Sequence, residues 1–267
     1  MELTVAGKTV RAATGGRPLD QGRPLLVLLH GAGMDHTVWA LVMRALAHGG
    51  YSVLAPDLPG HGKSEGPIPK SVEDYAMWTA SLIEATGFTS AHLAGHSLGS
   101  AIALQTAAAD SDLASSLILM GMAATTPVHP DLQAAADAGE HRAIELIMSW
   151  GLGPNAQMGR HPVPGMAMRA TGTRLMESVD AAALAADLRS SGSYTQGLEA
   201  AAAVACPALL ILGRRDQMTP ARNAEPLIEA LRDVSSVTIP DAGHMMMVED
   251  PNRVIDETLA FLATVEA

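Results

Sequence analysis

The chain of 267 residues has little of several features on which whole classes of protein depend. Its one cysteine, Cys206, cannot form a disulfide within the chain and is expected to pack as a small apolar side chain. Aromatic residues make up 3% of the sequence, which argues against a surface that stacks nucleic-acid bases. Basic residues number 17 against 28 acidic ones, and the net charge of −11 argues against nucleic acid or an anionic membrane as a partner.

Long apolar runs are also missing. No stretch is apolar for long enough to span a membrane, and residues 1–5 lack the basic start and apolar segment of a secretory leader. We therefore expect a soluble, cytoplasmic protein. Hydrophobic residues at 48% and charged residues at 17% are typical of a globular chain, which is long enough for one α/β domain with an insertion. The oligomeric state stays open.

Apolar segments alternate with helical patterns along most of the chain. The predicted strands are 24–29, 51–56, 90–94, 113–120, 207–212 and 236–239, with a hairpin at 3–5 and 9–13. The predicted helices are 35–48, 71–86, 101–109, 220–231 and 251–264, and Thr219 is expected to be the N-cap of the fourth. This alternation predicts an α/β fold with a doubly wound, mostly parallel sheet.

The alternation stops between residues 125 and 194. This part contains helical stretches at 132–150, 165–177 and 181–189, interrupted by Pro154, Pro162 and Pro164, and no clear buried strand. We predict a core of residues 1–124 and 195–267, with 125–194 inserted as a helical lid, or cap, over the carboxyl edge of the sheet. The cap should set specificity.

Methionines and two arginines of the cap region are candidates for the pocket wall. The methionines are Met148, Met158, Met166, Met168, Met176 and the run Met245–Met247. Flexible thioethers suit an adaptable apolar pocket, although any one of them is as well explained by ordinary packing. Arg169 and Arg174 could meet a substrate carboxylate, or they could simply be solvated.

One short stretch, Gly95-His96-Ser97-Leu98-Gly99, has the pattern G-x-S-x-G between a predicted strand and a predicted helix. In that context the pattern is typical of a nucleophile elbow, a tight turn that holds a serine in a strained conformation above the sheet. The two glycines would let strand and helix pass close to Ser97. The Leu98 N–H would point to where a negative oxygen forms. The alternative is a glycine-rich turn whose serine only caps the helix.

A serine hydroxyl needs a base to take its proton, and the base needs a third group to orient it. Asp216 and His244 each follow a predicted strand, and so each lies at the sheet edge where α/β sites form. The order Ser97, Asp216, His244 is that of a triad on such a sheet. Asp241 is a second candidate acid, but it is close in sequence to the histidine that it would have to reach behind. Taken singly, Asp216 could cap a loop and His244 could be a half-buried loop histidine.

Other site motifs fit less well. Gly31-Ala32-Gly33 follows a strand as a dinucleotide-binding loop does, but the third glycine that this loop needs is missing. Gly62-Lys63-Ser64 resembles the end of a phosphate-binding loop, but Asp57 stands where its first glycine belongs. His92 and His96 lie on a strand that runs into a turn, so they do not share a helical face as a metal pair would. We expect a core or surface role for both, no metal and no cofactor.

Five segments together resemble the serine hydrolases of the α/β-hydrolase superfamily. They are HGAG (30–33), PDLPGHGKS (56–64), GHSLG (95–99), GRRDQMTP (213–220) and AGHMMMVEDP (242–251). The resemblance spans most of the chain outside the cap. It implies the α/β-hydrolase fold with a helical cap, with Ser97 as nucleophile, His244 as general base and acid, and Asp216 as the orienting carboxylate.

The same resemblance implies that the Ala32 N–H joins the Leu98 N–H in an oxyanion hole, and that His30 and segment 57–64 are structural. It favours a carboxylesterase or lactonase that cleaves a small apolar ester through an acyl-enzyme, with a small-molecule substrate and no cofactor. An aspartate at the elbow would indicate dehalogenase or epoxide hydrolase chemistry, and Ser97 makes these a poor fit. The triad would also suit carbon–carbon bond hydrolysis or cofactor-free perhydrolysis. A non-catalytic small-molecule receptor on this scaffold is a further alternative.

Overall fold

The computed structural model describes residues 1–157, 161 and 165–266. Within these residues, eight strands form one sheet in the order β1-β2-β4-β3-β5-β6-β7-β8. The strands are β1 (Glu2–Val5), β2 (Lys8–Ala13), β3 (Leu25–Leu29), β4 (Ser52–Pro56), β5 (Ala91–His96), β6 (Ala114–Met120), β7 (Ala208–Gly213) and β8 (Val234–Ile239). β2 pairs antiparallel with β1 and β4, and the other neighbours are parallel. The doubly wound, mostly parallel sheet is therefore confirmed.

Helices cover both faces of the sheet. On one face lie the 3₁₀ helix η1 (His36–Trp39), α1 (Met43–His48), α11 (Met246–Glu249) and α12 (Pro251–Val265). On the other lie α2 (Val72–Thr86), α3 (Leu98–Ala109), α9 (Gly197–Ala203) and α10 (Glu225–Ala230), the last preceded by the 3₁₀ helix η2 (Ala221–Ala224). Alternate residues of β3 pack against the two layers, which is why this strand is an unbroken apolar run.

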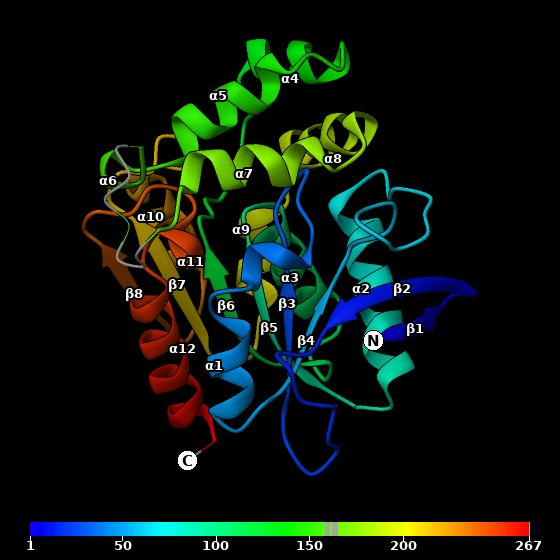
Figure 1. Ribbon diagram of the computed structural model, residues 1–267. Helices are drawn as coiled ribbons and strands as arrows, with labels where there is room; N and C mark the ends of the chain where they lie inside the picture. The colour runs from blue at the N-terminus through cyan, green and yellow to red at the C-terminus, as the bar shows by residue number, and fades with distance from the viewer. Residues whose placement is uncertain (158–160, 162–164, 267) are drawn as a thin grey trace.

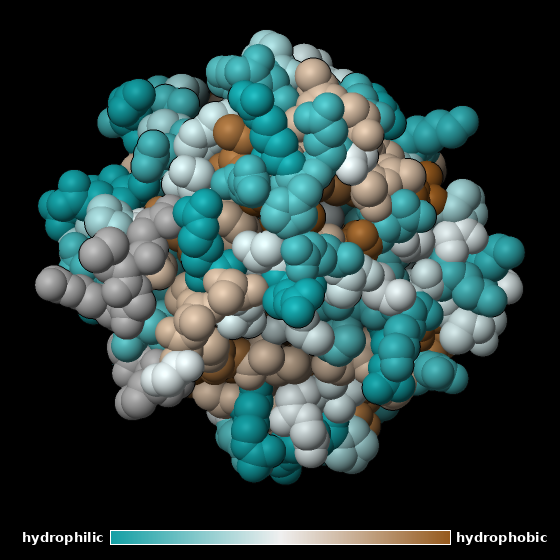
Figure 2. All heavy atoms as spheres, turned by 45° about the horizontal axis from the view of Figure 1, so that its top comes forward, coloured by the Kyte–Doolittle hydropathy of each residue, from teal (hydrophilic) through white to brown (hydrophobic). Residues whose placement is uncertain are grey.

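The remaining helices lie between β6 and β7 in the chain. They are α4 (Pro130–Asp137), α5 (Arg142–Gly151), α6 (Pro154–Gln157), α7 (Met168–Glu177) and α8 (Ala181–Ser193). Figure 1 shows α4, α5, α7 and α8 gathered at one end of the sheet, and Figure 2 looks on to that end, where polar and apolar side chains are mixed. We call the segment that contains helices α4 to α8 the cap. Division of the chain at residues 124 and 195 stays a prediction, and Met158, Pro162 and Pro164 lie outside the described residues.

The strand order reverses between β3 and β5. From β3 the chain moves to β4 on one side and then returns to β5 on the other side. In open parallel sheets, ligands bind in the crevice beyond the carboxyl ends of the strands at such a point. The loop at 30–33 follows β3 and the turn at Ser97 follows β5, so the topology brings these two motifs together.

Three predicted helices are each divided in the structure. Segment 35–48 forms η1 and α1, and Asp35 caps η1 by accepting the Thr37 N–H. Segment 132–150 forms α4 and α5, which are separated near Gly139, a residue with a left-handed φ of 65°. Segment 220–231 forms η2 and α10, and Pro226 in the first turn of α10 lacks the N–H that would continue one helix. Helices α6, α9 and α11 are absent from the sequence-based prediction.

No helix among the described residues is long and apolar enough to cross a membrane. Cys206 is half-buried and unpaired, and burial raises its thiol pKa to about 11, which agrees with a packing role.

The close packing of α3 against β3 leads to a prediction about stability. A Cβ at Gly99 would lie 2.1 Å from the Leu29 carbonyl oxygen, which is rigid backbone. We expect Gly99→Ala to lower the free energy of unfolding by about 3 kcal/mol, because the helix must move off the strand. Urea denaturation measures this difference. Gly22→Ala is the matched control, since a Cβ there meets only the end of the exposed Asp20 side chain; equal losses in the two variants would contradict the explanation.

Candidate active site

Ser97 stands at the turn between β5 and α3 with a left-handed backbone, φ 53° and ψ −116°. Apart from Ala6, no other described non-glycine residue has a positive φ. A Cβ at Gly95 would lie 2.1 Å from the Gly99 carbonyl oxygen, so the close approach expected of the two glycines is confirmed. The Ser97 side chain makes no capping hydrogen bond to α3, so the alternative of a serine that only caps the helix is wrong.

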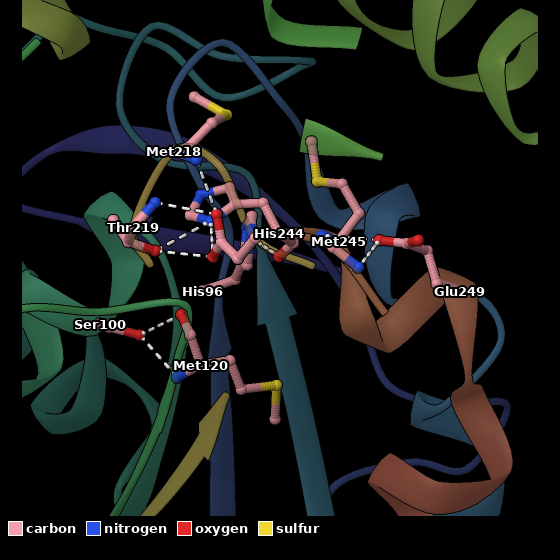
Figure 3. Close-up of polar contacts among 10 residues, drawn as sticks. His96, Ser100, Met120, Met218, Thr219, His244, Met245 and Glu249 are labelled. Atoms are coloured by element: carbon pink, nitrogen blue, oxygen red, sulfur yellow. Dashed lines mark hydrogen bonds and ion pairs between the residues drawn. The ribbon is translucent and has the colours of Figure 1, made fainter. Parts of the chain in front are cut away.

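Hydrogen bonds to β6 hold the turn. The Ser97 N–H donates to the Met120 carbonyl oxygen at 2.8 Å. The Ser100 hydroxyl donates to the Gly95 carbonyl oxygen at 2.7 Å. It also accepts the Met120 N–H at 2.9 Å, as Figure 3 shows. Ser100 is buried, and its part in the site is not visible in the sequence because Met120 is 20 positions away.

His244 and Asp216 meet as the sequence predicts. His244 Nδ1 lies 2.7 Å from Asp216 Oδ2, and the side chains are 2% and 1% exposed. The other carboxylate oxygen accepts the N–H groups of Met218 and Thr219, each at 2.8 Å. Burial alone would raise the pKa of Asp216, but His244 and these donors outweigh it and hold that pKa below its usual range. An ionised Asp216 keeps the proton on Nδ1 and leaves Nε2 as the acceptor.

Thr219 corrects an expectation. It is not the N-cap of the following helix, because η2 starts at Ala221 with Pro220 in the cap position. Its hydroxyl instead donates to Asp216 Oδ2 at 2.7 Å, and the oxygen lies 3.1 Å from His244 Nδ1 (Figure 3). As an N-cap the hydroxyl oxygen would accept a helix N–H, whereas here the hydroxyl donates to a charged acceptor, which gives the stronger hydrogen bond.

His96 lies behind His244, and its core role is confirmed. Its Nε2–H donates to the His244 carbonyl oxygen at 2.9 Å, and the two ring centroids are 4.7 Å apart. Burial, with His244 as the next cause, lowers the pKa of His96 to about 3. The ring is therefore neutral, and it puts no second charge beside an imidazolium at His244.

Glu249 fastens the loop that carries His244. It is a buried carboxylate that accepts the N–H groups of Gly243 at 2.9 Å and Met245 at 3.2 Å, on either side of the histidine (Figure 3). Its second oxygen accepts the N–H of Gly153 from the cap at 2.8 Å. Burial raises the pKa of Glu249, although these three donors oppose the shift. The sequence shows no local sign of this role.

A cavity of about 480 Å³ opens beside these groups. Ser97, His96, His244 and Ala32 line it, so the predicted nucleophile, base and one predicted oxyanion donor face one space. Leu98, which carries the other predicted donor, is the first residue of α3, where N–H groups have no partner within the helix. The cavity's apolar wall consists chiefly of Met34, Val128, Leu132, Ile147, Trp150, Leu188, Met218 and Met245. None of its described lining residues is Asp, Glu, Lys or Arg.

The other candidate pocket residues are mostly elsewhere. Arg169 and Arg174 line a separate surface pocket, and Arg174 is 85% exposed and paired with Glu177. Met246 and Met247 are core residues. Met148, Met168 and Met176 line a second, smaller cavity of about 90 Å³. Of the methionines named from the sequence, Met245 is the one described residue that lines the larger cavity.

A group of three side chains could hold a metal ion, judged by position alone. Asp35, His36 and Asp57 bring one ligand atom each within 4.8 Å of one another. Internal hydrogen bonds already occupy Asp57, whose oxygens accept the N–H and Nδ1–H of His36 and the N–H of Lys63. This explains Asp57 as the structural residue that the sequence predicts, within a turn rather than a site.

The comparison with known families agrees with this geometry. A model described as the alpha/beta hydrolase family matches residues 26–257. The chain belongs to this family.

Proteins similar to this chain have names that indicate different activities. The acetyltransferase component of the acetoin cleaving system from Pseudomonas putida is 29% identical, over 94% of this chain and 68% of that protein. The 2-hydroxy-6-oxo-6-(2'-aminophenyl)hexa-2,4-dienoic acid hydrolase from Metapseudomonas resinovorans is 25% identical, over 91% and 85%. Among solved structures, the enol-lactonase from Burkholderia xenovorans LB400 superposes with a TM-score of 0.87 at 21% identity, over 98% and 100% of the two chains. That likeness shows the fold.

The His36–Asp57 pair predicts a pH dependence of stability. The hydrogen bond to Asp57 raises the pKa of His36, so the pair stabilises the fold fully below the unfolded-state pKa of about 6.5 and less as pH rises through the folded-state value. We expect the melting-temperature advantage of wild type over His36→Asn to shrink between about pH 6 and pH 9. The matched control is the exposed His48→Asn; a constant advantage for wild type across this range would refute the linkage.

Proposed function

We propose that this α/β hydrolase cleaves carboxylic esters or lactones with small apolar groups, through an acyl-enzyme on Ser97. One observation carries the proposal. A buried Asp216 holds His244 by Nδ1 at 2.7 Å, and the histidine and the strained Ser97 face the same apolar cavity. This arrangement supplies a nucleophile, a base with a fixed tautomer, and a water-poor space for the substrate.

The proposed reaction has two steps. Ser97 Oγ attacks the carbonyl carbon while His244 Nε2 takes its proton, and the negative oxygen is bound by the N–H groups of Ala32 and Leu98. His244 then protonates the leaving alcohol, which departs as the acyl-enzyme forms. Water repeats the sequence on the acyl-enzyme and releases the acid. The charge on Asp216 stabilises the imidazolium in both steps.

The cavity wall supports an uncharged, apolar substrate. Its described residues include no Lys or Arg that would pair with a substrate carboxylate. Met34 and Met245 line both the main cavity and the smaller apolar one of about 90 Å³ beneath α7. Since methionine side chains are flexible, this wall could yield to a longer acyl chain.

Carbon–carbon bond hydrolysis is the second candidate. The observation that favours it is the likeness to the Metapseudomonas resinovorans hydrolase, which is named after a dienoic acid. Such an acid carries a carboxylate, and the absence of Lys and Arg from the described lining of this cavity favours the ester instead.

A panel of p-nitrophenyl esters tests the proposal. We expect wild type to hydrolyse short apolar esters in preference to ω-carboxylate analogues, and Ser97→Ala to lose activity by a factor of about 10⁴ or more, because the nucleophile is gone. Initial rates measure both effects, with melting temperatures to show that the variant is folded. Inertness of wild type toward every ester and lactone, with tight saturable binding of a small molecule, would indicate the receptor alternative.

The choice between the two candidate acids is also testable. We expect Asp216→Asn to lower kcat by a factor of about 10³ or more, since an amide at this position no longer fixes the tautomer of His244. Asp241→Asn is the matched control, because it removes the nearby acid, whereas the described partners of His244 Nδ1 are Asp216 and Thr219. Initial rates of hydrolysis of one p-nitrophenyl ester by the two variants show which aspartate orients His244. A larger loss in the Asp241 variant would reverse the assignment.

A further inference from the structure

Asp187 is a buried carboxylate on the cap helix α8, and no part of the proposed reaction uses it. Its side chain is fully buried. It nevertheless makes hydrogen bonds to three other parts of the chain. Oδ2 accepts the Gly33 N–H at 2.9 Å and lies 2.8 Å from His61 Nε2, and Oδ1 accepts the Tyr75 hydroxyl at 2.5 Å. Of the three partners, only Gly33 belongs to the loop at 30–33.

The hydrogen bonds fix the charges in this cluster. His61 Nδ1 lies 3.1 Å from the Pro59 carbonyl oxygen, and Nε2 faces the Asp187 carboxylate. Because both oxygens are acceptors, both ring nitrogens carry hydrogen, and His61 is an imidazolium. Burial lowers the pKa of His61, but Asp187 outweighs burial and raises it overall, in agreement with this. A charged pair is therefore enclosed between the cap and the core, where it needs every one of its hydrogen bonds.

Gly33 follows Ala32 directly, and its surroundings leave it little freedom. It has a left-handed φ of 63°, and a Cβ there would lie 2.7 Å from Leu184 Cδ1 on the same cap helix. On the other side of the loop, a Cβ at Gly31 would lie 2.7 Å from His96 Nδ1. The peptide that carries the Ala32 N–H therefore lies between the ring of His96 and helix α8. Asp187 supplies the hydrogen bond that holds the loop to α8.

We propose that Asp187 is a positioning residue that sets the direction of the Ala32 N–H through its hydrogen bond to Gly33, so that helix α8 forms part of the oxyanion site. This inference rests on the proposed function. It also means that α8 is a fixed wall and not part of a lid that swings away, because moving it would expose a buried ion pair and release the loop.

Replacement of the carboxylate tests the inference. Asp187→Ala removes the acceptor of the Gly33 N–H, and we expect kcat to fall about tenfold or more with KM within about twofold, since the donor is displaced but the cavity is kept. Asp187→Asn should recover most of kcat, because its amide oxygen can still accept the Gly33 N–H while its nitrogen faces the Tyr75 hydroxyl. The rate at which a fluorophosphonate probe labels Ser97, followed by mass spectrometry, should fall in proportion to kcat.

Asp137→Ala is the matched control. Asp137 is also a cap carboxylate bonded to helix α8, through Arg189 at 2.7 Å, but the pair is exposed. We expect this variant to keep kcat within about twofold of wild type. A folded Asp187→Ala protein with wild-type kcat, or a loss confined to KM, would overturn the inference. So would an Asp187→Asn protein as impaired as the alanine variant.

A second variant covers the case in which Asp187→Ala does not fold because His61 is left charged and unpaired. The double variant Asp187→Ala/His61→Gln removes that charge and still leaves the Gly33 N–H without its acceptor. His61→Gln alone keeps the acceptor and should retain more of kcat and of the labelling rate than the double variant. Equal kcat values and equal labelling rates in the single and double variants would overturn the inference.

The probe separates this inference from the proposed function. If wild-type Ser97 reacts with the fluorophosphonate but no ester is hydrolysed, the proposed function fails while the labelling rates still decide the role of Asp187. A wild-type protein that the probe does not label would refute both.

Discussion

A carboxylate that is removed from water must be surrounded by hydrogen-bond donors, and this requirement organises the loops around the cavity. Asp216 accepts hydrogen bonds from two backbone N–H groups, the Thr219 hydroxyl and His244. Glu249 accepts hydrogen bonds from the N–H groups that flank His244 and from one N–H of the cap. Asp187 accepts hydrogen bonds from the Gly33 N–H and from two side chains of the core. The loops that carry Ala32, Asp216 and His244 are thus each tied to a buried carboxylate, so displacement of such a loop would leave that carboxylate out of water and without its donors.

At the turn that carries Ser97, packing and hydrogen bonds offset the strain of the backbone. A serine at φ 53° is strained by of the order of 1–3 kcal/mol, and the strain persists only if the surroundings over-determine it. Packing of Gly99 against the Leu29 carbonyl and the hydrogen bonds of Ser97 and Ser100 to β6 supply that constraint. The same close approach brings the start of α3 to the carboxyl end of β3, where the loop at 30–33 begins. The close packing of α3 on β3 therefore both maintains the strain at Ser97 and brings the N–H groups of Ala32 and Leu98 near each other.

The sequence predicts the parts of this site that local chemistry decides. Ser97 is marked by small neighbours in a strand–turn–helix context, and Asp216 and His244 by their place after apolar strands. Thr219 was misassigned because a capping role and a carboxylate partner require the same residue type, and only the distance to Asp216 separates them. Asp187 shows no signal at all, since its contact with Gly33 spans 154 positions and α8 alone looks like an ordinary cap helix. Two of the three divided helices were predicted as continuous for a local reason of another kind, a single glycine or proline within a continuous periodic pattern.

The cap contributes to the cavity in two unequal ways. Leu132 lines the cavity from α4, and it packs in the core without a hydrogen bond from α4 to a loop that carries a reacting group among the described residues. Ile147 and Trp150 line it from α5, whose last residue, Gly151, accepts the His244 N–H at 2.7 Å. Leu188 also lines the cavity, but it sits beside Asp187 on α8. A substitution there that shifts the helix would disturb the proposed oxyanion site as well as the pocket. Substrate size can therefore be adjusted through Leu132 on α4 at the least cost to rate, whereas a change that shifts α5 or α8 would alter size preference and rate together.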